Sequence, residues 1–142
     1  MNALHPTTKK LNALLESGKR GEFIAMARNA KKLLKRYPKS SILLNLAGVA
    51  HTNLNVSTKA VGFYIKALAI EPNNADFLNN LGNAQVALKE YDLAIQNFEK
   101  AIYINPAFSL AFNNLGIALK AQGKVELAAE FFAKALSIDP ML

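Results

Sequence analysis

The chain has 142 residues, 51% of them hydrophobic, and it contains no cysteine. Disulfides and thiolate metal sites are therefore excluded. The hydrophobic content is sufficient for the core of one domain. No stretch approaches the roughly 18 consecutive apolar residues of a membrane span, and the first residues lack an apolar segment of secretory-signal length. We therefore expect a cytoplasmic chain.

The net charge of +7 is unevenly distributed. Residues 1–40 hold ten Lys and Arg against two acids, a balance of +8, whereas residues 41–142 hold seven bases against eight acids, a balance of −1. The sequence thus predicts a nearly neutral body with a basic N-terminal end.

Four prolines, Pro38, Pro72, Pro106 and Pro140, recur at intervals of 34 residues. Because proline cannot continue a helix, this spacing predicts one helical unit copied four times. With each proline at position 32 of its unit, the units span residues 7–40, 41–74, 75–108 and 109–142. Residues 1–6 are expected to form a disordered leader, and His5 lies in it.

The first unit, residues 7–40, departs from the other three. Leu14 stands where they carry glycine, and Ala30 stands where they carry an aromatic residue. Its second half carries cations at helical spacing: Arg28, Lys31, Lys32, Lys35 and Arg36. This basic patch is interpreted either as a docking site for an acidic or phosphorylated partner or an anionic membrane, or as a solvated outer face. Nucleic acid is disfavoured because no aromatic residues are interleaved for stacking.

The second unit, residues 41–74, repeats a pattern of small and large residues that the later units share. Glycine and alanine twelve residues apart are expected where the two helices cross, as in Gly48 and Ala60, with large Tyr64 nearby. His51 is interpreted as a packed, hydrogen-bonded side chain rather than a ligand or base, because no second histidine or cysteine accompanies it.

The third unit shows the clearest helical hairpin. Before a break at Lys89–Glu90, one face is shared at helical spacing by Leu78, Leu81, Gly82 and Gln85. After the break, one face is shared by Ala94, Phe98, Ala101 and Ile102. The pattern predicts two amphipathic helices of about 14 residues joined by a short turn. Such a turn favours a residue that tolerates positive φ, so Gly21, Asn55 and Gly123 suit their units and Lys89 does not.

The fourth unit ends with Asp139, Pro140, Met141 and Leu142. Without a further helix to cover the last hairpin, we expect an apolar patch that favours self-association, or a neighbouring segment outside these residues. The residues of this expected patch are Phe131, Leu136 and Ile138.

The repeat resembles the tetratricopeptide repeat family over residues 7–140. The resemblance rests on Leu81, Gly82, Ala94, Phe98, Ala101 and Pro106, together with their equivalents in the other units. It is similar in style to bacterial tetratricopeptide arrays and to the repeats of the protein O-GlcNAc transferases. The resemblance implies an all-α, right-handed superhelical solenoid of four antiparallel helix-turn-helix hairpins, whose first helices line a concave groove.

Asparagine recurs on the stripe that the resemblance assigns to the groove. One side-chain amide offers an acceptor and two donors, so it can bond both the N–H and the C=O of an extended peptide. The alternative is that these amides serve hydrogen bonds within the repeats. The predicted groove residues are Asn45, Asn79, Asn80, Asn83, Asn113 and Asn114.

Catalytic function has no support in the sequence, which lacks paired carboxylates, a nucleophile elbow and a glycine-rich phosphate loop. We expect no cofactor and no metal site. Three functional hypotheses follow: a non-catalytic protein–protein interaction module that binds an extended peptide, a self-assembling scaffold or spacer array, and the targeting segment of a larger enzyme such as a glycosyltransferase or sulfotransferase.

Overall fold

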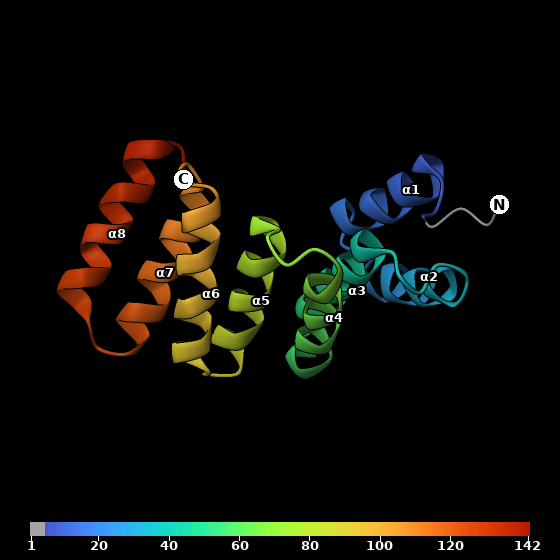
Figure 1. The fold of residues 1–142 in the computed structure, drawn as a ribbon, viewed down its shortest axis with the longest axis horizontal. Helices are drawn as coiled ribbons and strands as arrows, with labels where there is room; N and C mark the ends of the chain where they lie inside the picture. The colour runs from blue at the N-terminus through green and yellow to red at the C-terminus, as the bar shows by residue number, and fades with distance from the viewer. Residues whose placement is uncertain (1–4) are drawn as a thin grey trace. The chain divides into compact units, whose positions relative to one another are not determined.

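A computed structural model describes residues 5–142 of the chain, and this part contains eight α-helices and no strand (Figure 1). The chain divides into two compact halves, an N-terminal half that ends at Pro72 and a C-terminal half that spans Asn73–Leu142. Each half contains two of the four predicted hairpins, so the all-α fold of four helix-turn-helix hairpins is confirmed.

The N-terminal half is built from four helices that pack in chain order. α2 packs against α1 and α3, α3 packs against α4, and α1 also reaches α3. Pro6, in the expected leader, is buried, and His5 Nδ1 lies 3.5 Å from Ser40 Oγ, while the remainder of that leader lies outside the described residues. The helices are α1 (Thr8–Lys19), α2 (Phe23–Arg36), α3 (Ser41–Asn53) and α4 (Ser57–Ile70).

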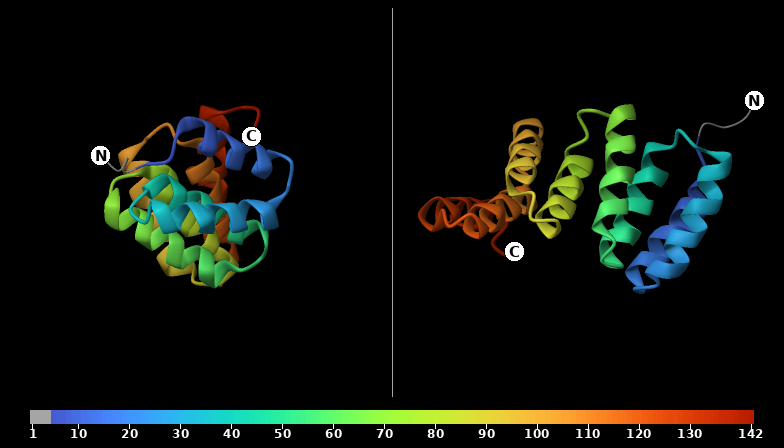
Figure 2. Two further views of the ribbon diagram at one scale, coloured as in Figure 1. Left: turned by 90° about the vertical axis from the view of Figure 1, so that its right-hand side faces the viewer. Right: turned by 90° about the horizontal axis from the view of Figure 1, so that it is seen from below.

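The C-terminal half repeats this arrangement, and Figure 2 shows its helices from two further sides. α6 packs against α5 and α7, α7 packs against α8, and the two first helices, α5 and α7, contact each other. The helices are α5 (Ala75–Ala87), α6 (Tyr91–Ile104), α7 (Ser109–Ala121) and α8 (Val125–Ile138).

Each hairpin ends at the residue before a proline, as the spacing predicts. These C-terminal residues have φ between −125° and −132° and ψ between 62° and 97°. Proline pushes its predecessor into this extended region, because its ring clashes with a helical neighbour. The four residues are Tyr37, Glu71, Asn105 and Asp139.

The turn inside each hairpin contains one residue with positive φ. Gly21 (72°) and Gly123 (81°) adopt this backbone without cost, whereas Asn55 (59°) and Lys89 (61°) do so despite a Cβ. The predicted turn positions are therefore confirmed in all four hairpins.

The core of the later hairpins contains an aromatic ring that lies on a glycine. A Cβ added to Gly82 would come 2.5 Å from Cε1 of Phe98, and one added to Gly116 would come 2.6 Å from Cε1 of Phe132. The nearest neighbour of each glycine is thus the ring and not the alanine expected opposite it, although Ala94 and the corresponding alanines are buried. Gly48 and Tyr64 repeat the contact in the second hairpin.

The first hairpin reverses the sizes at these two positions. Leu14 takes the place of the glycine and Ala30 takes the place of the ring, and both are buried in the same hydrophobic cluster. Gly18, one turn further along α1, leaves room for Met26, whose Sδ lies 3.3 Å from the position of a Cβ. The first unit therefore forms a hairpin like the others, but it packs a large residue on its first helix against a small residue on its second.

Candidate binding surfaces

The predicted asparagines of the C-terminal half lie on the first helices α5 and α7, but they differ in environment. Asn79 is buried, and its Oδ1 accepts a 2.9 Å hydrogen bond from Nδ2 of Asn114. This bond joins α5 to α7, so Asn79 and one N–H of Asn114 hold neighbouring repeats together. The interpretation of asparagine as an internal hydrogen-bonding residue applies to this pair.

Asn83 and Asn113 are half-buried and have no hydrogen-bond partner within the described part of the chain. Leu110 and Ile117, on the same stripe of α7 as Asn113, are exposed large apolar residues. The first helices α5 and α7 thus carry two amides with unused donors and acceptors, and α7 adds exposed apolar area on the stripe of Asn113. An extended peptide needs both kinds of contact.

The last two predicted asparagines are Asn80 and Asn45. Asn80 is half-buried on α5, and Asn45 is half-buried on α3 of the N-terminal half. Both already take part in an interaction within the chain. Asn83 and Asn113 are therefore the better candidates for contact with a ligand.

Position 11 of the repeat holds a packed polar side chain in two hairpins. Nδ1 of His51 donates to the carbonyl oxygen of Ala47 at 2.7 Å, and the His51 ring lies 5.1 Å from that of Phe63. At the same place in α5, Gln85 accepts a 2.7 Å bond from Nδ2 of Asn97. His51 is thus packed and hydrogen-bonded, as predicted.

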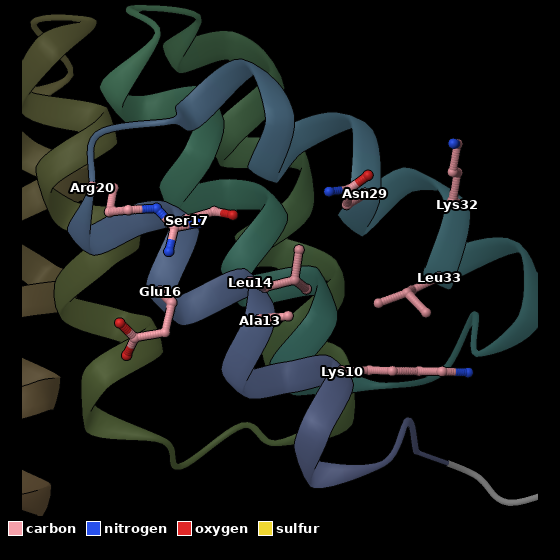
Figure 3. Close-up of a pocket in the computed structure, with 9 residues that line it drawn as sticks. All are labelled: Lys10, Ala13, Leu14, Glu16, Ser17, Arg20, Asn29, Lys32 and Leu33. Atoms are coloured by element: carbon pink, nitrogen blue, oxygen red, sulfur yellow. The ribbon is translucent and has the colours of Figure 1, made fainter.

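The five cations of the predicted basic patch are all exposed on α2, but they do not form one surface. Lys32 lines a cavity of about 500 Å³ between α1 and α2, together with Lys10 and Arg20 (Figure 3). Arg36 lies over the ring of Tyr37, with its Cζ 5.5 Å from the ring centre. The other three, Arg28, Lys31 and Lys35, line a separate hollow between α2 and α4.

Two cations at or beside the α1–α2 cavity are paired with acids. Arg20 donates to both carboxylate oxygens of Glu22, at 2.9 and 3.1 Å, and Lys19 lies 2.8 Å from Glu16. The hydrogen bond from Lys19 lowers the pKa of Glu16, and that from Arg20 lowers the pKa of Glu22. Within residues 5–142, Lys10 and Lys32, which also line this cavity, have no carboxylate partner.

The hollow between α2 and α4 contains residues that the sequence did not single out. Lys59 and Lys66 of α4 face it from the side opposite the α2 cations, with Gly62 between them. Their spacing along α4 shows that they share a helix face, but only the packing of both helices on α3 brings them opposite α2.

The predicted self-association residues are exposed to different degrees. Leu136 is 48% exposed, whereas Phe131 and Ile138 are half-buried. The Phe131 ring stacks on Phe112 with centroids 6.3 Å apart, so it belongs to the hydrophobic core of the C-terminal half. Of the three, Leu136 is the one whose side chain is available for a contact.

Residues 5–142 hold no group of three or more His, Asp or Glu side chains placed to bind a metal ion. Within the same residues, none of the helices combines the length and the apolar character required to cross a bilayer.

Repeated helical hairpins with a polar and apolar stripe along their first helices define a helical-repeat protein of the kind that binds other proteins. A family model described as tetratricopeptide repeat matches residues 75–108 and 109–142, which are the two hairpins of the C-terminal half. These two hairpins are therefore tetratricopeptide repeats. No curated protein matches the sequence.

Solved structures agree with this assignment. A crystal structure of MamA is 26% identical, with a TM-score of 0.79, over 88% of this chain and 73% of its own. PilF of Pseudomonas aeruginosa is 27% identical, with a TM-score of 0.85, over 94% of this chain and 61% of its own. MamA of Desulfovibrio magneticus RS-1, at 18% identity and a TM-score of 0.83 over 92% of this chain and 74% of its own, shares the fold.

Proposed function

We propose that this protein–protein interaction module is non-catalytic and binds an extended peptide segment along α5 and α7. The observation that carries the proposal is that Asn83 and Asn113 are half-buried amides without an intramolecular partner in residues 5–142. Exposed Leu110 and Ile117 lie on the same stripe of α7 as Asn113. Each amide can accept from a peptide N–H and donate to a peptide C=O, while the leucine and isoleucine cover apolar side chains.

In this arrangement the asparagines divide their roles. The Asn79–Asn114 bond fixes α5 beside α7, and Asn83 and Asn113 contact the peptide. Replacing Asn79 and Asn114 removes a hydrogen bond that contributes about 1 kcal/mol and lowers stability. Replacing Asn83 and Asn113 leaves the described hydrogen bonds of the fold intact.

The test is selection of peptides from a random displayed library on the wild-type chain, followed by titration of one selected peptide against two double variants. Asn83→Ala with Asn113→Ala is expected to weaken binding at least about tenfold, because both amides contact the peptide backbone. Gln96→Ala with Asn29→Ala, two exposed amides on α6 and α2, serves as the matched control.

N-methylation of alternate peptide bonds in the selected peptide removes N–H groups. These are the groups from which the side-chain oxygens of Asn83 and Asn113 would accept hydrogen bonds. The same peptide should then lose binding to the wild-type chain. Unchanged affinity after N-methylation, or equal affinity of the asparagine variant and the control, would reject this mode of binding.

We also propose a second function, self-association through the last hairpin, because Leu136 is exposed on α8 whereas Phe131 and Ile138 are half-buried. Light scattering over a concentration series should show growing mass for the wild type and a monomer for Leu136→Glu. The control is Ile65→Glu, which places the same charge on an exposed apolar residue of α4. A wild-type chain that stays monomeric throughout would exclude this function.

A further inference from the structure

The hollow between α2 and α4 is a groove of about 720 Å³ that lies within the N-terminal half. α3 forms its floor, where Leu44 and His51 are among the lining residues. Leu34 of α2 and Phe63 of α4 add apolar surface on either side. The groove thus has an apolar base that a ligand can cover.

Five cations stand around this base, and no acidic residue lines the groove. Three come from α2 and two from α4: Arg28, Lys31, Lys35, Lys59 and Lys66. None of the five is paired with a carboxylate anywhere in residues 5–142, unlike Arg20 beside the α1–α2 cavity. Five like charges around one groove repel each other, and an acidic ligand would relieve that repulsion.

Gly62 is the second unusual feature of the groove. It lies inside α4, where glycine costs about 1 kcal/mol relative to alanine. It does not form a turn, and a Cβ placed there would meet no atom within 4 Å. Neither the backbone conformation nor the packing of the chain accounts for this glycine. Its effect is to leave the α4 wall low between Lys59 and Lys66.

We infer that this groove binds an acidic amphipathic segment of another protein. The apolar face of the segment lies on Leu44 and Phe63, its carboxylates pair with the cations of α2 and α4, and its backbone passes over Gly62. The inference rests on the proposed protein-binding function, but it concerns a surface separate from Asn83 and Asn113.

The spacing of the cations fits such a segment. Arg28 and Lys35, and likewise Lys59 and Lys66, are seven residues apart, which is about 10 Å or two turns along a helix. A flat anionic bilayer would meet protruding cations but could not reach an apolar floor at the base of a groove. The groove therefore favours a peptide over a membrane surface.

The test uses a fluorescein-labelled synthetic peptide in which leucine recurs every third or fourth residue among glutamates. Its counterpart carries glutamine in place of every glutamate. Binding to the full chain is followed by fluorescence anisotropy at several salt concentrations. We expect the acidic peptide to bind, with affinity falling as salt rises, and the glutamine peptide to bind at least about tenfold more weakly.

Two double variants of α2 separate groove binding from general charge attraction. Lys31→Glu with Lys35→Glu changes two groove residues, and Lys32→Glu with Arg36→Glu makes the same change in net charge at the adjacent positions outside the groove. The first should weaken binding of the acidic peptide at least about tenfold, and the second at most about threefold. Equal loss in both variants would overturn the inference.

A third variant blocks the groove without altering charge. Gly62→Leu fills the low part of the α4 wall and should weaken binding of the acidic peptide, while circular dichroism shows unchanged helicity. Retained affinity in Gly62→Leu would contradict the inference. So would the absence of acidic-peptide binding, including the case in which the chain binds only phosphatidylserine vesicles. The double variant Asn83→Ala, Asn113→Ala should bind this peptide normally, so failure of one proposed surface is distinguishable from failure of the other.

Discussion

Gly82 and Gly62 both lie inside helices, but for different physical reasons. Any side chain at Gly82 would overlap the ring of Phe98, whereas one at Gly62 would meet nothing. The first glycine is required by packing within its hairpin, and the second is not required by any contact of the fold.

Alanine substitution should therefore have opposite effects at these two glycines. Gly82→Ala is expected to lower the free energy of unfolding by about 1–3 kcal/mol, because the overlap with Phe98 outweighs the gain in helix propensity. Gly62→Ala should raise it by about 0.5–1 kcal/mol, since only the propensity changes. Urea denaturation of both variants measures the difference, and equal shifts would show that the ring does not constrain Gly82.

Tyr64 is the one aromatic residue at the glycine contact that carries a hydroxyl. Thr52 Oγ1 donates to the carbonyl oxygen of Gly48 at 3.0 Å, so Tyr64 donates its own proton to Thr52 Oγ1, also at 3.0 Å. Burial raises the pKa of Tyr64 to about 12. The folded state therefore favours the protonated side chain.

This shift predicts a loss of stability at alkaline pH. The contribution of Tyr64 is fully present below the unfolded-state pKa of about 10 and is lost as pH rises toward 12, by up to about 2–3 kcal/mol. Tyr64→Phe, which places at this position the residue found at Phe98 and Phe132, should lose less stability over the same range. Because the two proteins differ only at this residue, the difference between their unfolding free energies isolates Tyr64. A difference that stays constant from pH 9 to pH 12 would contradict the assignment.

At the scale of the helical hairpin, the turn residues decide how easily two helices reverse direction. Lys89 has φ of 61°, in the region where a Cβ crowds the backbone, and its equivalents in the first and last hairpins are Gly21 and Gly123. The third hairpin therefore forms its turn against the preference of its own sequence.

Lys89→Gly should leave stability unchanged or raise it by up to about 1 kcal/mol, because relief of the strained backbone offsets the greater flexibility of the unfolded chain. The reverse change, Gly123→Lys, should lower stability by about 1–2 kcal/mol. Thermal melts compare the two. Clear destabilisation by Lys89→Gly would mean that the lysine side chain contributes contacts that its turn position does not reveal.

The hairpins themselves could be predicted from the sequence because their signals are local. Proline fixes the backbone of the residue before it, and the 34-residue spacing places all four ends. In the sequence, Leu14 and Ala30 appear only as departures from the repeat pattern. The pattern does not show that the small Ala30 makes room for the large Leu14. That compensation depends on packing in three dimensions.

At the scale of the whole molecule, two surfaces that were predicted on single helices are shared between helices in the structure. The asparagine row predicted on single first helices contains the Asn79–Asn114 bond between α5 and α7. The basic patch predicted on α2 is divided, and part of it joins Lys59 and Lys66 of α4. Helical periodicity gives the face of a residue on its own helix, but the partner across a groove depends on how that helix packs on the next.

The ring-on-glycine contact also bears on how such a chain can change in evolution. Both members of the contact lie within one 34-residue block, so a tandem duplication or deletion of whole blocks keeps every ring with its own glycine. A crossover inside a block would join the leucine of the first block to the ring of a later one and place two bulky side chains at one point. Recombination at block boundaries is therefore the route by which this array can gain or lose length without losing its core.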